Sequence, residues 1–206
     1  MEKSALIVGA GAGLSSSLAF QCKNSGMHVA LAARDIGKLK SLSEQTGASL
    51  YKCDASKIED VNLLFEELDA KSGTPDLVVY NPSSRLRGAI ETLNADKTKE
   101  ALEVTCFGAF LVAQQAAKRM LARGSGSIFF TGASAGVKGF ANSSVFAMGK
   151  FGLRGLAQAL ARELHPKNIH IGHFVIDGGI KSDARPERQG NGDYDCLLYT
   201  SPSPRD

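Results

Sequence analysis

The sequence predicts a single-domain α/β fold with a parallel sheet, and three observations lead to that prediction. Short apolar runs typical of buried strands alternate with longer stretches of helical periodicity along most of the chain. A glycine-rich turn joins the first apolar run to the first helical stretch. The 206 residues, 43% of them hydrophobic, are enough for one domain with a sizeable core.

The first strand and helix, residues 5–8 and 14–22, flank the sequence Gly9-Ala10-Gly11-Ala12-Gly13-Leu14. Glycine lets a backbone approach a bulky ligand, while the N–H groups and positive dipole end of a helix attract an anion. At the first strand-to-helix crossing, such a turn is typical of a dinucleotide pyrophosphate site. We therefore expect this turn to bind a dinucleotide through Gly9, Gly11, Gly13 and Leu14.

The second strand, residues 28–33, ends in Ala33 and is followed by Arg34 and Asp35. An acid at the end of this strand would bind the ribose 2′-hydroxyl of NAD, whereas an arginine accommodates the 2′-phosphate of NADP. Arg34 therefore favours NADP(H), with NAD(H) as the alternative. Asp35 either caps the next helix or competes as a ribose ligand.

A helix over 36–45, ended by Gly47, and a third strand over 49–53 come next. Asp54 follows that strand and can reach an adenine edge. Equally, Asp54 or Ser56 can cap the helix over 58–70, and these two roles are compatible. Every third or fourth residue of this helix forms an apolar stripe, namely Val61, Leu64, Phe65 and Leu68.

The second half of the chain continues the alternation. Strands are predicted over 76–81, 127–131 and 169–176, and helices over 95–122 and 143–164. Gly108 lies where the first of these helices needs a small residue for close packing. Two strands end in polar or small residues at their carboxyl ends, where open α/β sheets bind ligands.

From residue 3 to about 182 the chain resembles the short-chain dehydrogenase/reductase family, whose members are oxidoreductases with a Rossmann fold. The resemblance rests on five motifs that occur in the family's order. Its G-x-x-x-G-x-G pattern is matched by Gly9 and Gly13, with Ser15 in place of the third glycine. The other matches are Asp54 for the adenine-binding Asp, Asn81 in Asn-Asn-Ala-Gly, Lys150 in Tyr-x-x-x-Lys, and Asp177-Gly178-Gly179-Ile180 loosely for Pro-Gly.

The resemblance implies a doubly wound sheet in the order 3-2-1-4-5-6 and hydride transfer between NADP(H) and a small carbonyl or alcohol substrate. It implies that Asp54, Asn81 and Lys150 contact the cofactor. It also implies a homodimer or homotetramer that pairs the helices over 95–122 and 143–164. The residues expected to contribute surface there are Phe110, Gln114, Leu156 and Leu160.

The departures from the family pattern fall on its chemistry. Phe146 occupies the place of the catalytic Tyr, which is the family's general acid/base and whose pKa the Lys lowers. Ala133 occupies the place of the catalytic Ser, with Ser134 one residue further on, and Thr105 replaces the helix Asn. A phenyl ring can neither donate nor accept a proton. We therefore expect either an oxidoreductase in which Ser134 or an ordered water takes over part of the proton transfer, or a dinucleotide-binding sensor or scaffold that has lost the chemistry.

Composition argues against several other classes of protein. The net charge is +3 without a basic block, so we expect no nucleic-acid partner. No apolar run is long enough to span a membrane, and Met1-Glu2-Lys3 leads directly into the first strand without a signal peptide. The cysteines, which lack metal-ligand spacing, fit a reducing cytoplasm and predict no metal site. They are Cys22, Cys53, Cys106 and Cys196.

The pattern ends near residue 182. We expect residues 1–182 to form the NADP-binding domain and 183–206 to be an unstructured tail. The family's seventh strand is missing from this tail, which would leave a sheet edge unpaired. Residues 196–206 resemble the in-frame translation of a sequencing-library adapter, so we expect this segment to be non-native.

Overall fold

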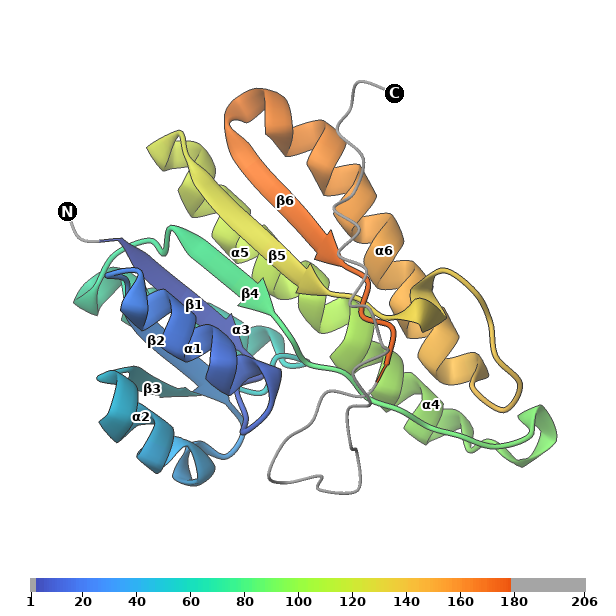
Figure 1. Ribbon diagram of the computed structural model, residues 1–206. Coiled ribbons are helices and arrows are strands. Elements are labelled where there is room, and N and C mark those ends of the chain that lie inside the picture. The colour runs from blue at the N-terminus through green and yellow to red at the C-terminus, as the bar shows by residue number, and fades with distance from the viewer. Residues whose placement is uncertain (1–2, 179–206) are drawn as a thin grey trace.

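The strands form one parallel sheet in the computed structural model, which describes residues 3–178 of the chain (Figure 1). Within these residues, six strands are paired in the order β3-β2-β1-β4-β5-β6. This is the order predicted from the sequence. The strands are β1 Ser4–Val8, β2 His28–Ala33, β3 Ser49–Lys52, β4 Leu77–Tyr80, β5 Gly126–Thr131 and β6 Ile169–Phe174.

Helices cover both faces of the sheet (Figure 1). Helices α1 (Leu14–Asn24) and α2 (Lys40–Thr46) lie on one face, and α3 (Ile58–Lys71), α5 (Gly108–Arg123) and α6 (Ser144–Leu164) lie on the other. Because side chains alternate along a strand, β1 serves two separate cores. Ala5 and Ile7 pack into the core under α1, and Leu6 and Val8 into the core under α3, α5 and α6.

The helical stripes predicted from the sequence face this second core. Val61, Leu64, Phe65 and Leu68 of α3 are all buried. On α6, Leu153 and Leu164 are buried, whereas Leu156 and Leu160 are only partly buried. Gly47 ends α2 with a positive φ of 72°, as its position after the helical pattern indicates.

The helix predicted over 95–122 is interrupted, so its prediction as one continuous helix was wrong. Helix α4 (Ala95–Leu102) passes into a π-helical turn at Glu103–Phe107 before α5 begins. The carbonyl of Val104 accepts a hydrogen bond of 2.5 Å from the Tyr80 hydroxyl, and Thr105 Oγ1 accepts one of 3.0 Å from the Ser84 N–H. These bonds tie the wider turn to the last residue of β4 and to the segment that follows it.

Several predictions about the end of the chain lie outside the described residues. They are the domain boundary at 182, the unstructured tail 183–206, the non-native segment 196–206 and the missing seventh strand. Within residues 3–178, no helix is both long and apolar enough to cross a lipid bilayer.

Replacing Gly108 with alanine should test the close packing predicted at this position. A Cβ there would lie 2.5 Å from both the Ala55 carbonyl oxygen and the Tyr80 hydroxyl. We expect Gly108→Ala to lower the free energy of unfolding by about 1–3 kcal/mol, measured by urea denaturation. Gly155→Ala is the control, because a Cβ there meets nothing within 4 Å, and it should stabilise α6 by about 0.5–1 kcal/mol. Equal effects of both changes would contradict tight packing at Gly108.

Candidate active site

A cleft opens at the carboxyl ends of the strands, where the strand order reverses between β1 and β4. One part is a cavity of about 370 Å³ that extends from the turn after β1 to Phe146 and Lys150 of α6. The other part, of about 890 Å³, extends toward the ends of β2 and β3. Both parts share Gly9, Gly11, Ala12, Asn81, Ser83 and Arg85, so they form one continuous cleft.

The turn after β1 is held against the segment after β4. Gly9 has a φ of +75°, and a Cβ at this position would lie 2.7 Å from the Pro82 ring, so only glycine fits. The Asn81 side-chain amide donates to Ser15 Oγ at 2.8 Å and to the Gly9 carbonyl at 3.3 Å. Asn81 lines the cleft, and its amide shapes the turn after β1, whereas its predicted contact with the cofactor stays a prediction.

The N-terminus of α1 suits a bound anion. Its N-cap is Gly13, which provides no side-chain hydrogen bond, and its first turn holds no acidic residue. A Cβ on Gly11 would meet nothing within 4 Å, so there is open space over this turn. Gly9, Gly11, Gly13 and Leu14 all line the cavity. N–H groups without side-chain caps and a positive dipole end fit a pyrophosphate here.

The wider part of the cleft contains the residues predicted near the adenosine. Arg34, Asp35 and Asp54 line it together, and Arg34 is exposed to solvent. Asp35 caps the 3-10 turn Ile36–Leu39 by accepting a 3.1 Å bond from the Gly37 N–H, so its capping role is confirmed.

The alternative in which Asp54 or Ser56 caps α3 was wrong. Helix α3 begins after Lys57, whose side chain makes no capping bond. Asp54 Oδ1 instead accepts bonds from the Ser56 N–H at 3.1 Å and from Ser56 Oγ at 2.8 Å. Asp60 Oδ2 accepts a hydrogen bond of 2.8 Å from the Asp54 backbone N–H. These local bonds occupy both side chains before the helix starts.

Lys150 is the buried cation at the other end of the cleft. Its side chain is only 2% exposed, and its Nζ donates a 2.7 Å hydrogen bond to the Thr131 carbonyl at the end of β5. Burial, with a further contribution from the positive charge of Arg85, lowers the pKa of Lys150 to about 8. The buried imidazole of His173 also has a lowered pKa, about 4, because of burial and the nearby charges of Lys150 and Arg154.

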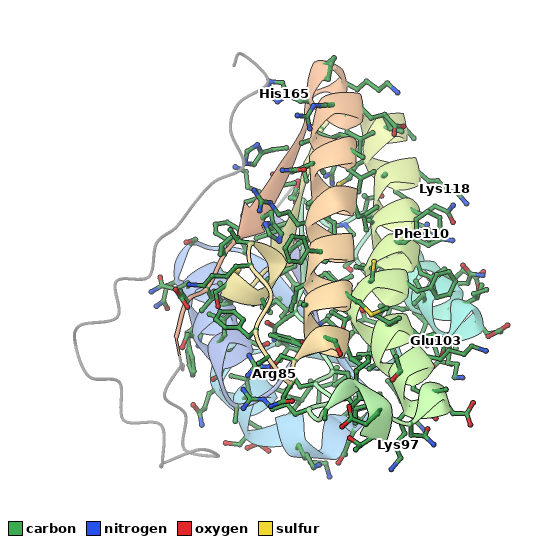
Figure 2. All side chains as sticks on the ribbon, turned by 90° about the vertical axis from the view of Figure 1, so that its right-hand side faces the viewer. Arg85, Lys97, Glu103, Phe110, Lys118 and His165 are labelled. Carbon is green, nitrogen blue, oxygen red and sulfur yellow. The ribbon has the colours of Figure 1, made fainter. Side chains whose placement is uncertain are left out.

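Phe146 lies one helical turn before Lys150 and is 7% exposed. The Arg85 Cζ atom lies 4.2 Å from the centre of its ring, and the Lys150 Nζ atom lies 5.9 Å from that centre. Arg85 comes from the segment after β4 and approaches the N-terminal end of α6 (Figure 2). Sequence reasoning missed Arg85, because its only local signal is that it follows a strand that ends at the cleft.

The residues predicted around the missing hydroxyl are not all brought together. Of these two described residues, Ala133 lines the cavity and Ser134 does not. Ser134 begins the 3-10 turn Ser134–Gly136, and its N–H donates to the Ile176 carbonyl at 3.1 Å. Thr105 is buried and bonded to Ser84. A catalytic role for Ser134 stays a prediction.

A parallel sheet in this order, with a glycine-rich turn at its switch point, defines a Rossmann-type nucleotide-binding fold. The family model described as short chain dehydrogenase matches residues 3–191. The chain belongs to this family, and it is an oxidoreductase of the short-chain dehydrogenase/reductase type.

Individual relatives agree with this assignment. A human 3-oxoacyl-[acyl-carrier-protein] reductase is 27% identical over 185 residues, which cover 89% of this chain and 78% of the relative. A short-chain dehydrogenase structure from Rhodopseudomonas palustris is 32% identical with a TM-score of 0.77, and the match covers 84% of each chain. A structure from Streptomyces avermitilis, described as a short-chain dehydrogenase, shares the fold with a TM-score of 0.83 at 24% identity, covering 89% of this chain and 68% of that one.

Replacing Lys150 with methionine should stabilise the protein at neutral pH. A lysine whose pKa is about 8 when folded, against 10.5 ordinarily, opposes folding while it is protonated, and this cost disappears as the pH rises through that interval. At neutral pH we expect Lys150→Met to raise the free energy of unfolding by roughly 1–3 kcal/mol. This difference from the parent should shrink between about pH 8 and pH 10.

Chemical denaturation at several pH values measures this difference. Lys118→Met is the control, because Lys118 is exposed on α5, far from the end of α6 that holds Lys150 (Figure 2). The control should differ little from the parent at any of these pH values. A Lys150→Met difference that is independent of pH would show that Lys150 keeps its ordinary pKa.

Proposed function

We propose that the protein is an NADP(H)-dependent oxidoreductase that interconverts a small carbonyl compound and its alcohol. The observation that supports this most is the single continuous cleft. At one end it meets Arg34 and Asp54, at its middle the uncapped N-terminus of α1, and at the other end Lys150. The order of these three groups of residues along the cleft suits a phosphorylated adenosine, a pyrophosphate and a nicotinamide ribose in that order.

Each part of the cofactor has residues suited to hold it. Gly11, Gly13 and Leu14 would receive the pyrophosphate, Arg34 the 2′-phosphate and Asp54 the adenine edge. Lys150 would hold the nicotinamide ribose, with its Nζ already fixed on the Thr131 carbonyl. Bound there, the nicotinamide supplies or accepts the hydride.

The proton that accompanies hydride transfer needs a donor or acceptor other than the tyrosine that the family uses. Phe146 cannot carry it. Lys150, whose Nζ lies 5.9 Å from the ring centre, has a pKa of about 8 that suits proton exchange near neutral pH. Ser134 or a water molecule is the other candidate donor.

A second function is favoured by Phe146 itself. A cleft with cofactor-binding residues but no acid/base hydroxyl also suits a dinucleotide sensor or scaffold that has lost the chemistry. Turnover separates the two functions.

We also propose that the protein acts in the cytoplasm as a homodimer or homotetramer that pairs α5 and α6. Phe110 of α5 is 42% exposed (Figure 2). It stacks against Phe107 of the preceding π-helical turn, with ring centres 6.2 Å apart, so the start of α5 and this turn together present an aromatic surface. On α6, Phe151 is similarly exposed at 45%. No nucleic-acid or membrane partner is proposed.

Truncating Arg34 should weaken NADP(H) binding selectively. Pairing of an arginine with a phosphate is charge-assisted, so Arg34→Ala should cost on the order of 1.5–3 kcal/mol of NADP(H) affinity. NAD(H) affinity should barely change, because it lacks the 2′-phosphate. Calorimetric titrations with both dinucleotides measure this, and Lys40→Ala is the control, because Lys40 is exposed nearby but absent from the cleft lining. Equal losses for both dinucleotides would contradict the assignment.

Restoring the hydroxyl at position 146 should increase the rate of carbonyl reduction. General acid–base catalysis contributes typically 10²–10⁴-fold, so Phe146→Tyr should raise kcat by about 10²-fold or more. The nearby cations Arg85 and Lys150 would also lower the pKa of the new hydroxyl. Phe140→Tyr is the control, because it adds the same group at a residue that is 45% exposed and absent from the cleft lining, and it should leave kcat unchanged.

The same assay tests the two functions. Turnover on the best substrate of a ketone panel is measured for the full chain, for Ser134→Ala and for Lys150→Ala. Lys150→Ala should weaken cofactor binding as well as turnover. Turnover that survives both changes would place the chemistry elsewhere, and NADP(H) binding without any turnover would favour the sensor.

A further inference from the structure

His173 is a buried titratable residue of β6 that has no role in the proposed chemistry. It is only 4% exposed, and among the described residues its Nε2 atom has no hydrogen-bond partner. Buried polar atoms are nearly always paired, so an unpaired nitrogen in a core points to a partner that completes it. The place of this imidazole in the fold indicates which group that partner serves.

The imidazole lies against the end of β5. Side chains alternate along a strand, so His173 shares a face with Ile171, which packs into the core under α6 (Figure 1). A Cβ on Gly132 would lie 2.6 Å from both Cε1 and Nε2 of His173. Because Gly132 also lines the cavity, the Nε2 edge of the ring rests against the backbone of the cleft wall.

Lys150 reaches the same part of the cleft wall from α6. Its Nζ donates to the carbonyl of Thr131, the residue that directly precedes Gly132. The ammonium group and the Nε2 edge of His173 therefore lie against two consecutive residues at the end of β5. An ammonium group has three N–H donors, and the Thr131 carbonyl accepts one of them, which leaves two for other acceptors.

The charges around His173 favour a neutral imidazole near pH 7. The charged groups that act on it, Lys150 and Arg154, both come from α6, and residues 126–131 of β5 include no titratable side chain. Burial and these two cations lower the pKa of His173 to about 4. A neutral imidazole has one N–H donor and one lone-pair acceptor, so an unprotonated Nε2 accepts a hydrogen bond.

We propose that His173 is a positioning residue for Lys150, whose ammonium group it holds through one water molecule that donates to Nε2. This water accepts a hydrogen bond from one N–H of Lys150, which stabilises the charged form of the lysine. With two N–H groups fixed at the cleft wall, the ammonium directs the third toward the cofactor. That consequence rests on the proposed function, because it concerns how Lys150 holds the nicotinamide ribose.

The tautomer of His173 tests the proposal on the unmodified chain. The ¹⁵N chemical shifts of the full chain, labelled on histidine, distinguish a ring protonated on Nδ1 from one protonated on Nε2 near pH 7. The signal of His173 is identified by its loss in His173→Gln. We expect the proton on Nδ1, because Nε2 must accept. A proton on Nε2 would overturn the proposal.

The pKa of Lys150 provides a second test in the full chain without cofactor. It is followed through the ¹³Cε chemical shift of labelled lysine, which Lys150→Met assigns. His173→Phe and His173→Leu remove the acceptor, so they should lower the pKa of Lys150 by about one unit or more, a tenfold loss of proton affinity. His173→Gln supplies an amide oxygen as acceptor and should keep the pKa near that of the parent.

His170→Phe is the matched control. It makes the same change in the same strand, at an exposed residue whose ring contacts Phe129 on the other face of the sheet. It should leave the pKa of Lys150 unchanged. An unchanged pKa of Lys150 in both apolar variants of His173, or an equal decrease in His170→Phe, would overturn the proposal. If neither apolar variant folds, the tautomer of the unmodified chain decides.

Titration with NADP⁺ near pH 8, about the pKa of Lys150, separates this inference from the proposed function. The apolar variants of His173 leave less of Lys150 charged, so they should bind NADP⁺ severalfold more weakly, and His173→Gln should bind it like the parent. A lowered pKa of Lys150 with unchanged NADP⁺ affinity would keep the pairing with His173 and overturn the ribose role. Weaker NADP⁺ binding at an unchanged pKa of Lys150 would overturn the pairing and keep the NADP(H) assignment.

Discussion

The close approach of two turns at the switch point of the sheet is the constraint on which the cleft depends. The Asn81 N–H continues the β1–β4 pairing by donating to the Val8 carbonyl at 3.0 Å. Beyond this hydrogen bond, the segments that follow β1 and β4 diverge and line the cleft. Gly9 packs against Pro82 without room for a Cβ, and the Asn81 amide bonds both Gly9 and Ser15. A larger residue at position 9 would move the start of α1 and its N–H groups away from the sheet.

The far end of the cleft is governed by electrostatics. A buried ammonium costs free energy unless polar groups of the protein take the place of its water. The buried Lys150 Nζ donates a hydrogen bond to the Thr131 carbonyl. Its lowered pKa and that of His173 both reflect burial near other positive groups. Near these positive charges, the family's tyrosine has a hydroxyl that could carry a negative charge. Phe146 lacks this hydroxyl, and its ring makes a cation–π contact with Arg85.

Most of the fold could be predicted because its signals are local. Buried parallel strands form short apolar runs, and the stripe on α3 repeats every third or fourth residue, so both follow from residues near in sequence. The break between α4 and α5 could not be predicted in this way. It depends on Tyr80 and Ser84, whose bonds to Val104 and Thr105 join residues more than 20 positions apart.

The sequence by itself determined the class of fold, the order of its elements along the chain and the residues of the glycine-rich turn. It could do so because the spacing of hydrophobic residues and the residue types of a turn are properties of short segments. It also determined that position 146 carries no hydroxyl. Only the tertiary structure decided what surrounds that ring. Arg85 and Lys150 are 65 residues apart in the chain, and they meet at Phe146 because parallel pairing brings the ends of β4 and β5 beside α6. The contacts and electrostatics of that site follow from this distant pairing, which no local pattern in the sequence encodes.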